Sequence, residues 1–182
     1  MAIDLKTGAH AIGNASKLLA TRGGAHIYNV VLSTDADNSN LIARGDASDF
    51  DQYAEATATE FKGKIQWAAY DRQAETWGYY VEVTADTNAL YVFNYPDNPY
   101  NSPFDSTKFF YNKAGSIVRA HELKVGDILF TTPESFSGTP EVGAEIDGIS
   151  KKKLVVVETT ESTDTESTDT ESTDTEDTDT TN

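Results

Sequence analysis

His121 and Glu122 are the only histidine and carboxylate that stand side by side in this chain. An imidazole hydrogen-bonded to a carboxylate can act as a general base, so this pair is the first candidate for catalysis. Both residues lie in "SIVRAHEL" (116–123), whose β-branched and apolar residues predict a strand. Neighbouring side chains of a regular strand point to opposite faces, so the two cannot hydrogen-bond to each other. We therefore interpret them as surface or rim side chains, and we assign no catalytic residue.

The residues after this strand predict a tight turn and a second strand. Gly126 can adopt a positive φ angle, and the Asp127 carboxylate can accept hydrogen bonds from backbone amides. The run "DILFTT" (127–132) then has the composition of a strand. Residues 116–132 are therefore predicted to be strand, tight turn and strand, and not a reaction centre.

A calcium-binding loop is the second candidate, in "DADNSNLIARGD" (35–46). The first ligand positions of such a loop and its twelfth position are occupied by Asp35, Asp37, Ser39 and Asp46. However, Asn40 replaces the glycine that makes the sharp turn, and the twelfth residue is Asp instead of Glu. The flanking residues also resemble strands and not helices. A hairpin loop explains the segment equally well, so we assign no metal ligand.

The tripeptide Arg44–Asp46 ("RGD") is a motif of cell-adhesion proteins. A match of three residues recurs often by chance. Residues 1–24 contain no apolar run long enough for a signal peptide or a membrane span. We therefore interpret the tripeptide as a chance match, and we expect the chain to be made in the cytoplasm.

Aromatic residues are dense between positions 67 and 100. In "GYYVEVT" (78–84), Tyr79, Val81 and Val83 share one face of a strand and their neighbours share the other. One face is expected to be core, and most of the aromatics are explained by core and loop packing. Aromatics exposed on the other face could form a subunit contact or a carbohydrate platform. The candidate contact residues are Trp67, Tyr70, Trp77, Tyr80, Tyr91, Tyr95 and Tyr100.

Charge and composition disfavour several classes of partner. The 182 residues carry a formal net charge of −16, and ten of the 30 acidic residues lie in residues 158–182, which contain no Lys or Arg. Acidic surfaces repel phosphates, so we expect neither a nucleic-acid partner nor an anionic membrane partner. The chain has no Cys, which excludes disulfides and thiolate nucleophiles. It has only three His, so few imidazole ligands are available for a metal site. No cofactor is expected.

Short runs of β-type composition recur at spacings near ten residues. The predicted strands are 25–33, 41–45, 61–71, 76–84, 89–95, 108–112, 116–123, 127–132, 141–146 and 152–158. The first two are expected to form a hairpin, and residues 46–60 a loop with a helical turn. No apolar pattern of helical period persists over three turns. The spacing predicts an all-β fold, a compact antiparallel barrel or sandwich of short strands.

Composition also divides the chain into three parts. Residues 1–24 are small, polar and rich in Gly, which predicts an N-terminal arm that can be extended. Residues 25–157 predict a β-rich structural domain, with two small subdomains as the alternative if the Pro-rich stretch 96–106 is a break. Residues 158–182 repeat "ESTDT" three times and contain no apolar residue, so we expect a disordered acidic tail.

Two blocks in residues 61–157 stand in a suggestive order. "YYVEVTADTNALYVF" (79–93) is followed by a Pro-rich loop and then by "YNKAGSIVRAHELKVGDILF" (111–130). This order resembles that of small virion structural proteins of tailed bacteriophages. The resemblance implies a β-rich accessory part of the particle, such as a head decoration or cement protein, and carries no active-site residues. It also implies a virion location and a partner such as the major capsid protein or another virion protein. A homo-oligomer would suit attachment at a symmetry axis.

Three functions remain open at this point. The first is a non-enzymatic structural part on the head exterior, with the acidic tail outward because packaged DNA would repel it. The second is a tail-associated or surface module that binds carbohydrate, supported by the density of Tyr and Trp. The third is a glycosidase with two carboxylates, for which no acid–base pair is indicated.

Overall fold

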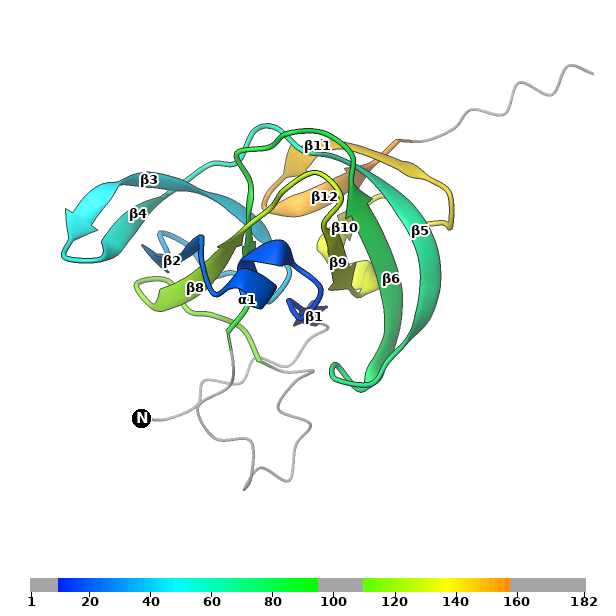
Figure 1. Ribbon diagram of the computed structural model, residues 1–182, viewed down its shortest axis with the longest axis horizontal. Coiled ribbons are helices and arrows are strands. Elements are labelled where there is room, and N and C mark those ends of the chain that lie inside the picture. The colour runs from blue at the N-terminus through cyan, green and yellow to red at the C-terminus, as the bar shows by residue number, and fades with distance from the viewer. Residues whose placement is uncertain (1–9, 95–109, 158–182) are drawn as a thin grey trace, which may run out of the picture.

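The computed structural model describes residues 10–94 and 110–157, which form a closed five-stranded barrel and a seven-stranded sheet (Figure 1). In spatial order, the barrel consists of β2 (Ile27–Val31), β4 (Gln52–Ala56), β3 (Leu41–Asp49), β7 (Leu90–Val92) and β8 (Ile117–Glu122). The sheet consists of β1 (Gly13–Asn14), β9 (Ile128–Thr131), β6 (Thr76–Val83), β5 (Lys62–Asp71), β11 (Glu145–Ser150), β12 (Lys153–Val156) and β10 (Phe136–Ser137). A short helix, α1 (Leu19–Gly23), and a 3-10 turn (Pro133–Ser135) complete the elements. The predicted all-β fold is confirmed.

One hydrophobic core joins the barrel to the sheet. Leu41 of β3 and Tyr91 of β7 pack in the same cluster as Val81 and Val83 of β6. The predicted alternation of β6 is therefore confirmed, because its valines are fully buried and Tyr79 on the same face packs against them. A second cluster, which includes Val30, Leu90 and Val118, fills the barrel.

Residues 10–24 belong to the fold, so the expected arm is wrong for this part. β1 pairs with β9, and Leu18 is fully buried in the main core. The close approach of β1 to Tyr91 requires a glycine, because a Cβ on Gly13 would overlap the Tyr91 hydroxyl oxygen. Burial of a few apolar side chains thus stabilises residues 10–24 against the rest of the fold. Residues 1–9 lie outside the described residues, as do the proposed break at 96–106 and the acidic tail.

The strand pairing around residues 25–60 differs from the predicted hairpin. β2 pairs with β4 in parallel and with β8 in antiparallel orientation, whereas β3 pairs with β4 and β7. Residues 46–60, expected to be a loop with a helical turn, instead form most of the β3–β4 hairpin. Their Asp- and Ser-rich composition favours loops, but cross-strand pairing overrides that weak preference. Figure 1 shows this hairpin projecting from the barrel, on the side away from the β5–β6 hairpin.

The prediction of a strand at 108–112 is also wrong for residues 110–112, which the structure describes. These residues form only an isolated bridge, between Asn112 and Ala36. By contrast, the turn at 125–127 has the predicted chemistry. Gly126 has a φ of 87°, and the buried Asp127 carboxylate accepts hydrogen bonds from the Leu19 and Lys124 amides, each at 2.8 Å. The two strands that it joins, however, lie in different assemblies: β8 in the barrel and β9 in the sheet. The turn is a crossing between them and not a hairpin.

The Asp127→Ala substitution is expected to lower the free energy of unfolding by about 3 kcal/mol, because it leaves two amides without their charged acceptor. One of these amides begins α1, so the helix should loosen as well. Urea denaturation of the variant and of the exposed control Asp86→Ala measures the difference. Equal stability of the two variants would show that Asp127 does not hold this crossing together.

Candidate functional site

The seven aromatic candidates do not form one surface. Tyr80 and Tyr91 are buried, and each uses its hydroxyl inside the protein. The Tyr91 hydroxyl donates to the Phe130 carbonyl at 2.6 Å and accepts from the Asn14 amide at 2.9 Å. Burial raises the pKa of Tyr91. These two residues are part of the framework. Tyr95 and Tyr100 lie outside the described residues.

Tyr80 is anchored by a buried carboxylate that the sequence analysis did not single out. Asp71 accepts hydrogen bonds from the Tyr80 hydroxyl at 2.7 Å, from the Asn14 side chain at 3.0 Å and from the Gln73 and Ala74 amides at 2.8 Å. Burial alone would raise the pKa of Asp71, but these hydrogen bonds outweigh burial and the pKa is lowered. Burial and the charge of Asp71 raise the pKa of Tyr80 to about 12. The local signal for this arrangement is an Asp just before a turn, because its carboxylate can accept hydrogen bonds from the backbone amides of the turn.

The three exposed candidates belong to two separate aromatic pairs with different surroundings. Trp67 stacks on Tyr80 with ring centroids 5.2 Å apart, and the Lys17 ammonium lies 4.3 Å from the Tyr80 centroid. Tyr70 and Trp77 are cross-strand partners near the turn of the β5–β6 hairpin, and their centroids are 6.2 Å apart. Because the ladder is regular from residue 67 to residue 71, Trp67 and Tyr70 point to opposite faces. A single aromatic platform is therefore not formed.

Large aromatic side chains are exposed at the ends of both long hairpins. Trp77 is 68% exposed and Tyr70 is 49% exposed at the β5–β6 end. Phe50, in the turn of the β3–β4 hairpin, is 93% exposed. The sequence analysis missed Phe50, although its position between two aspartates indicated a solvent-exposed turn. Phe50 and Trp77 are thus the two most exposed large hydrophobic side chains among the described residues.

His121 is buried, so its interpretation as a surface or rim side chain is wrong. It is 5% exposed, and its Nδ1 atom lies 3.1 Å from the Thr21 hydroxyl of α1. The physical reason is that α1 covers this face of β8, which the sequence of the strand alone does not reveal. Burial, helped by the positive charge of Arg119, lowers the pKa of His121 to about 4.

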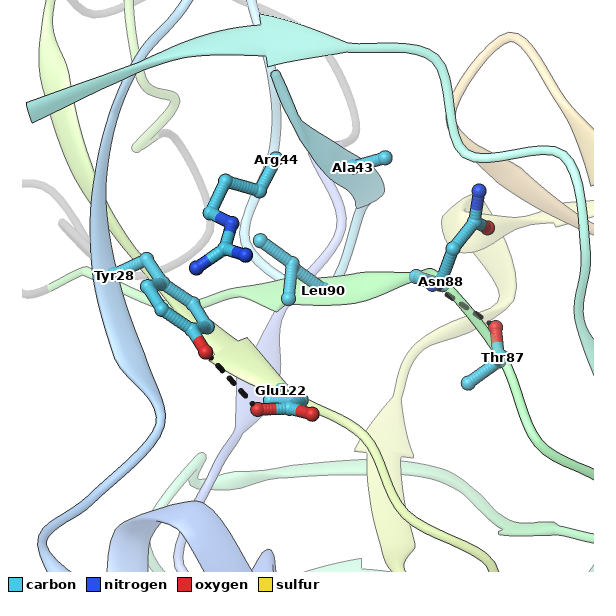
Figure 2. Close-up of a pocket in the computed structure, with 8 residues that line it drawn as sticks. Tyr28, Ala43, Arg44, Thr87, Asn88, Leu90 and Glu122 are labelled. Carbon is cyan, nitrogen blue, oxygen red and sulfur yellow. Dashed lines mark hydrogen bonds between the residues drawn. The ribbon is translucent and has the colours of Figure 1, made fainter. Parts of the chain in front are cut away.

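Glu122 points to the other face of β8, as predicted, and has its own partners there. Its carboxylate lies 2.9 Å from His26 Nδ1 and 2.5 Å from Lys124 Nζ, and it accepts a hydrogen bond of 3.2 Å from the Tyr28 hydroxyl. Burial would raise the pKa of Glu122, but Lys124 above all, with Tyr28 and His26, lowers it. The carboxylate is therefore ionised at neutral pH. It lines a pocket at the barrel, shown in Figure 2.

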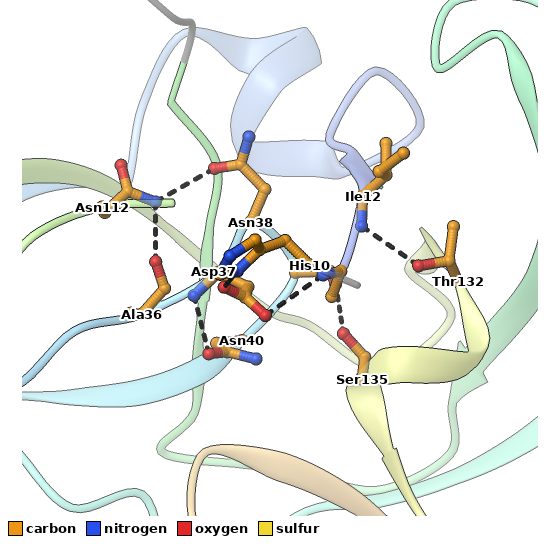
Figure 3. A network of polar contacts seen from close by, with 11 residues as sticks. His10, Ile12, Ala36, Asp37, Asn38, Asn40, Asn112, Thr132 and Ser135 are labelled. Atoms are coloured by element: carbon orange, nitrogen blue, oxygen red, sulfur yellow. Dashed lines mark hydrogen bonds and ion pairs between the residues drawn. The ribbon is translucent and has the colours of Figure 1, made fainter. Parts of the chain in front are cut away.

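The four candidate calcium ligands do not converge on one point. Asp37 pairs with His10 Nδ1 at 2.6 Å and accepts from the Ala11 amide, within the network of Figure 3. The remaining candidates lie elsewhere: Asp35 accepts from the Ala114 amide, Ser39 bonds the Thr131 and Ser135 hydroxyls, and Asp46 is exposed on β3. Within residues 10–94 and 110–157, no group of three or more His, Asp or Glu is placed to hold a metal ion. These side chains instead tether neighbouring segments.

The RGD tripeptide lies within β3 and not at a loop tip. Arg44 is stacked on two tyrosine rings, and a Cβ on Gly45 would lie 3.0 Å from the Ala54 carbonyl oxygen of β4. An adhesive loop needs its Arg and Asp side chains presented together to a partner. Here the guanidinium is instead turned into the pocket of Figure 2.

Comparison with protein-family models, with curated proteins and with solved structures found no match. In the part of the chain that the structure describes, no helix has the length and apolar character needed to cross a membrane. The functional argument therefore rests on the geometry above: aromatic hairpin ends on the surface, buried carboxylates that hold backbone amides, and a small polar pocket at the barrel.

Proposed function

We propose that this protein is a non-enzymatic structural component of a bacteriophage particle, a decoration or cement protein bound to the outside of the head. The observation that carries the proposal is the exposure of Phe50, Tyr70 and Trp77 at the ends of two hairpins. Large aromatic side chains contribute little to folding when they remain in water, and they are enriched in the centres of protein interfaces. Their positions suit contact with neighbouring subunits.

The proposed partner is the major capsid protein or another virion protein, and the protein itself acts as a homo-oligomer. Neither nucleic acid nor a membrane is part of the proposal, in keeping with the net charge of −16.

The two sequence blocks that resemble virion proteins contain residues that build the fold, which supports a structural role. Val81, Val83 and Tyr91 are core residues, and Gly126 and Asp127 form the crossing from barrel to sheet. A resemblance at such positions concerns architecture and not catalysis.

Immunogold electron microscopy of particles purified from the source culture tests the location. An antibody against the "ESTDT" repeat is expected to label the heads of intact particles. Labelling confined to the tail or its tip would contradict the head assignment and favour a tail-associated module. Particles that contain the protein but bind no antibody until the capsid is opened would contradict an external position. Absence of the protein from particles would contradict the virion proposal itself.

The hairpin ends can be tested separately from the location. In a rebinding assay with particles that lack the protein, Trp77→Ala and Phe50→Ser are each expected to weaken binding at least tenfold, because central aromatics dominate interface energies. Their melting temperatures should stay close to that of the unsubstituted protein, since both side chains are exposed. Glu141→Ala, exposed and distant from both hairpin ends in the sequence, is the matched control. Unchanged rebinding of both aromatic variants would exclude the hairpin ends as the contact.

Carbohydrate binding remains the alternative, because Tyr70 and Trp77 form an exposed aromatic pair with ring centroids 6.2 Å apart. Titration with cell-wall polysaccharide, followed by tryptophan fluorescence, distinguishes the two functions. The structural role predicts no saturable change. A saturable change that disappears in Trp77→Phe would instead identify the pair as a sugar platform. Trp67 remains in that variant as the internal reference.

A further inference from the structure

The barrel carries a small pocket that is separate from the aromatic hairpin ends. Its volume is about 220 Å³, and it is lined by residues from β2, β3, β7 and β8 and from the segment that precedes β7. The mouths of β-barrels are common sites for small ligands. Tyr28, Arg44, Thr87, Asn88 and Glu122 provide its polar groups, and the largely buried Ala43, Ala89 and Leu90 form its apolar wall (Figure 2).

Within residues 10–94 and 110–157, Arg44 is held by ring stacking and not by hydrogen bonds from its guanidinium. Its Cζ atom lies 4.6 Å from the Tyr28 ring centroid and 5.0 Å from the Tyr53 centroid, and these two rings meet edge to face. Stacking of this kind fixes a guanidinium and leaves its N–H groups free. Among the described residues, no carboxylate lies within ion-pair distance of Arg44.

Two carboxylates close to Arg44 in the fold, one across the ladder and one in the same pocket, already have other partners. Glu55 stands directly across the β3–β4 ladder, but it pairs with Lys152 at 2.7 Å and accepts from the Ser33 amide and hydroxyl. Glu122 is held by Lys124, His26 and Tyr28. In the described part of the chain, Arg44 is therefore a pocket-lining guanidinium without an acidic partner.

Tyr28 contacts both of the opposite charges in the pocket. Its ring face lies 4.6 Å from Arg44 Cζ and its hydroxyl donates to Glu122 at 3.2 Å, so one side chain holds both charged groups. An ionised carboxylate has about four acceptor positions, and two at Glu122 are taken by hydrogen bonds from Tyr28 and Lys124, with His26 Nδ1 2.9 Å from the oxygen that Tyr28 bonds. One further donor can be accepted there. A ligand with several negative charges would be repelled by Glu122.

We propose that this pocket binds a small zwitterion, whose carboxylate pairs with Arg44 and whose ammonium donates to Glu122. The carbon atoms between the two charges would lie on Ala43, Ala89 and Leu90. A planar carboxylate matches the guanidinium fork with two parallel hydrogen bonds. The site does not depend on the virion proposal, because none of its residues belongs to the hairpin ends.

NMR titration of the full chain with three matched compounds tests this site. β-Alanine carries both charges, propionate carries only the carboxylate and propylamine carries only the ammonium. We expect β-alanine to bind saturably with a Kd on the order of 1 mM, typical of so small a ligand, and to shift the Arg44 Nε and Ala89 amide signals. Propionate should bind at least tenfold more weakly, and propylamine should not saturate. Glycine and 4-aminobutyrate extend the test to shorter and longer spans.

Variants of the two charged residues make the assignment specific. Arg44→Gln is expected to abolish saturable binding, whereas Arg44→Lys should weaken it several-fold because lysine lacks the planar fork. Glu122→Gln should reduce the affinity for β-alanine to that for propionate. Arg72→Gln, at an exposed position in the β5–β6 turn, is the matched control and should bind like the unsubstituted protein. The backbone NMR spectrum of each variant confirms that it is folded.

Three outcomes would overturn the proposal. If none of glycine, β-alanine and 4-aminobutyrate saturates below about 50 mM, the pocket does not bind this class of ligand. If propionate or sulfate binds as tightly as β-alanine, the site recognises an anion only and Glu122 plays no part. If folded Arg44→Gln and Arg44→Lys both bind β-alanine like the unsubstituted protein, binding occurs elsewhere.

Discussion

The Asp71→Ala substitution is expected to lower the free energy of unfolding by about 4 kcal/mol. The buried carboxylate accepts hydrogen bonds from Tyr80, Asn14 and two backbone amides, all of which would lose a charged acceptor. Hydrogen bonds to charged groups contribute roughly 1.5–3 kcal/mol each, but their effects are not additive within one cluster. The expected loss is therefore larger than for one bond and smaller than the sum.

Asp71→Asn separates the effect of charge from that of shape. The amide keeps one acceptor oxygen but turns an N–H₂ group toward donors, so we expect about half of the loss seen with alanine. Asp147→Ala is the control, because that carboxylate is exposed and only 3.7 Å from Lys62, a surface pair of small energy. Urea denaturation curves followed by tryptophan fluorescence measure all three variants. If Asp71→Ala unfolds within about 1 kcal/mol of Asp147→Ala, the cluster does not stabilise the fold as argued.

The second large effect is an acid-induced loss of stability that depends on His121. Its pKa is about 4 in the folded protein, against 6.5 for an unperturbed histidine. The unfolded chain therefore binds a proton first as the pH falls, and stability decreases between pH 6.5 and about 4. The shift corresponds to about 3 kcal/mol, since one pKa unit is about 1.4 kcal/mol. Above pH 6.5 this contribution is constant.

The pH window distinguishes His121 from the carboxylates. Asp71, Glu55 and Glu122 have lowered pKa values, so their contributions are present above their unfolded pKa values of 3.8–4.5 and are lost only as the pH falls through still lower values. The free energy of unfolding, measured by urea denaturation from pH 7 to pH 4.5, should therefore fall in the unsubstituted protein. It should be nearly flat in His121→Gln, which keeps a group that can bond to Thr21.

His26→Gln is the matched control for that experiment, because its side chain is 61% exposed and lies on the other side of β8, beside Glu122. It should retain the acid dependence of the unsubstituted protein. An unchanged dependence in His121→Gln would mean that another group titrates in this window and that His121 is accessible to protons in the folded state.

Local patterns in the sequence identified several of the strands and the position of one turn. Alternation of apolar residues with a period of two identified β6, and it placed Val81 and Val83 on one face. Gly126 and Asp127 specified their turn because a positive φ and a side chain that accepts backbone N–H bonds are properties of single residues. These features depend on neighbours within a few positions, so they can be read from the chain directly.

The candidate site was predictable only in its composition. The density of Tyr and Trp near residues 67–80 was visible, but the division into buried Tyr80 and exposed Trp77 depends on which face each strand presents to the core. The pocket around Arg44 was not predictable, because its residues come from four separate strands and one connecting segment. Their meeting depends on barrel closure, which local periodicity does not encode.

Tertiary structure alone decided how the elements are partnered. β8 and β9 are separated by one tight turn, yet they belong to different assemblies. His121 became a buried residue because α1, about 100 positions earlier in the chain, covers its face of the strand. The hydrogen bond from Asn14 to Asp71 likewise joins segments that are far apart in the chain. A strand pattern states only that one face is apolar, whereas the contacts that cover each face come from distant segments brought together by the shared core.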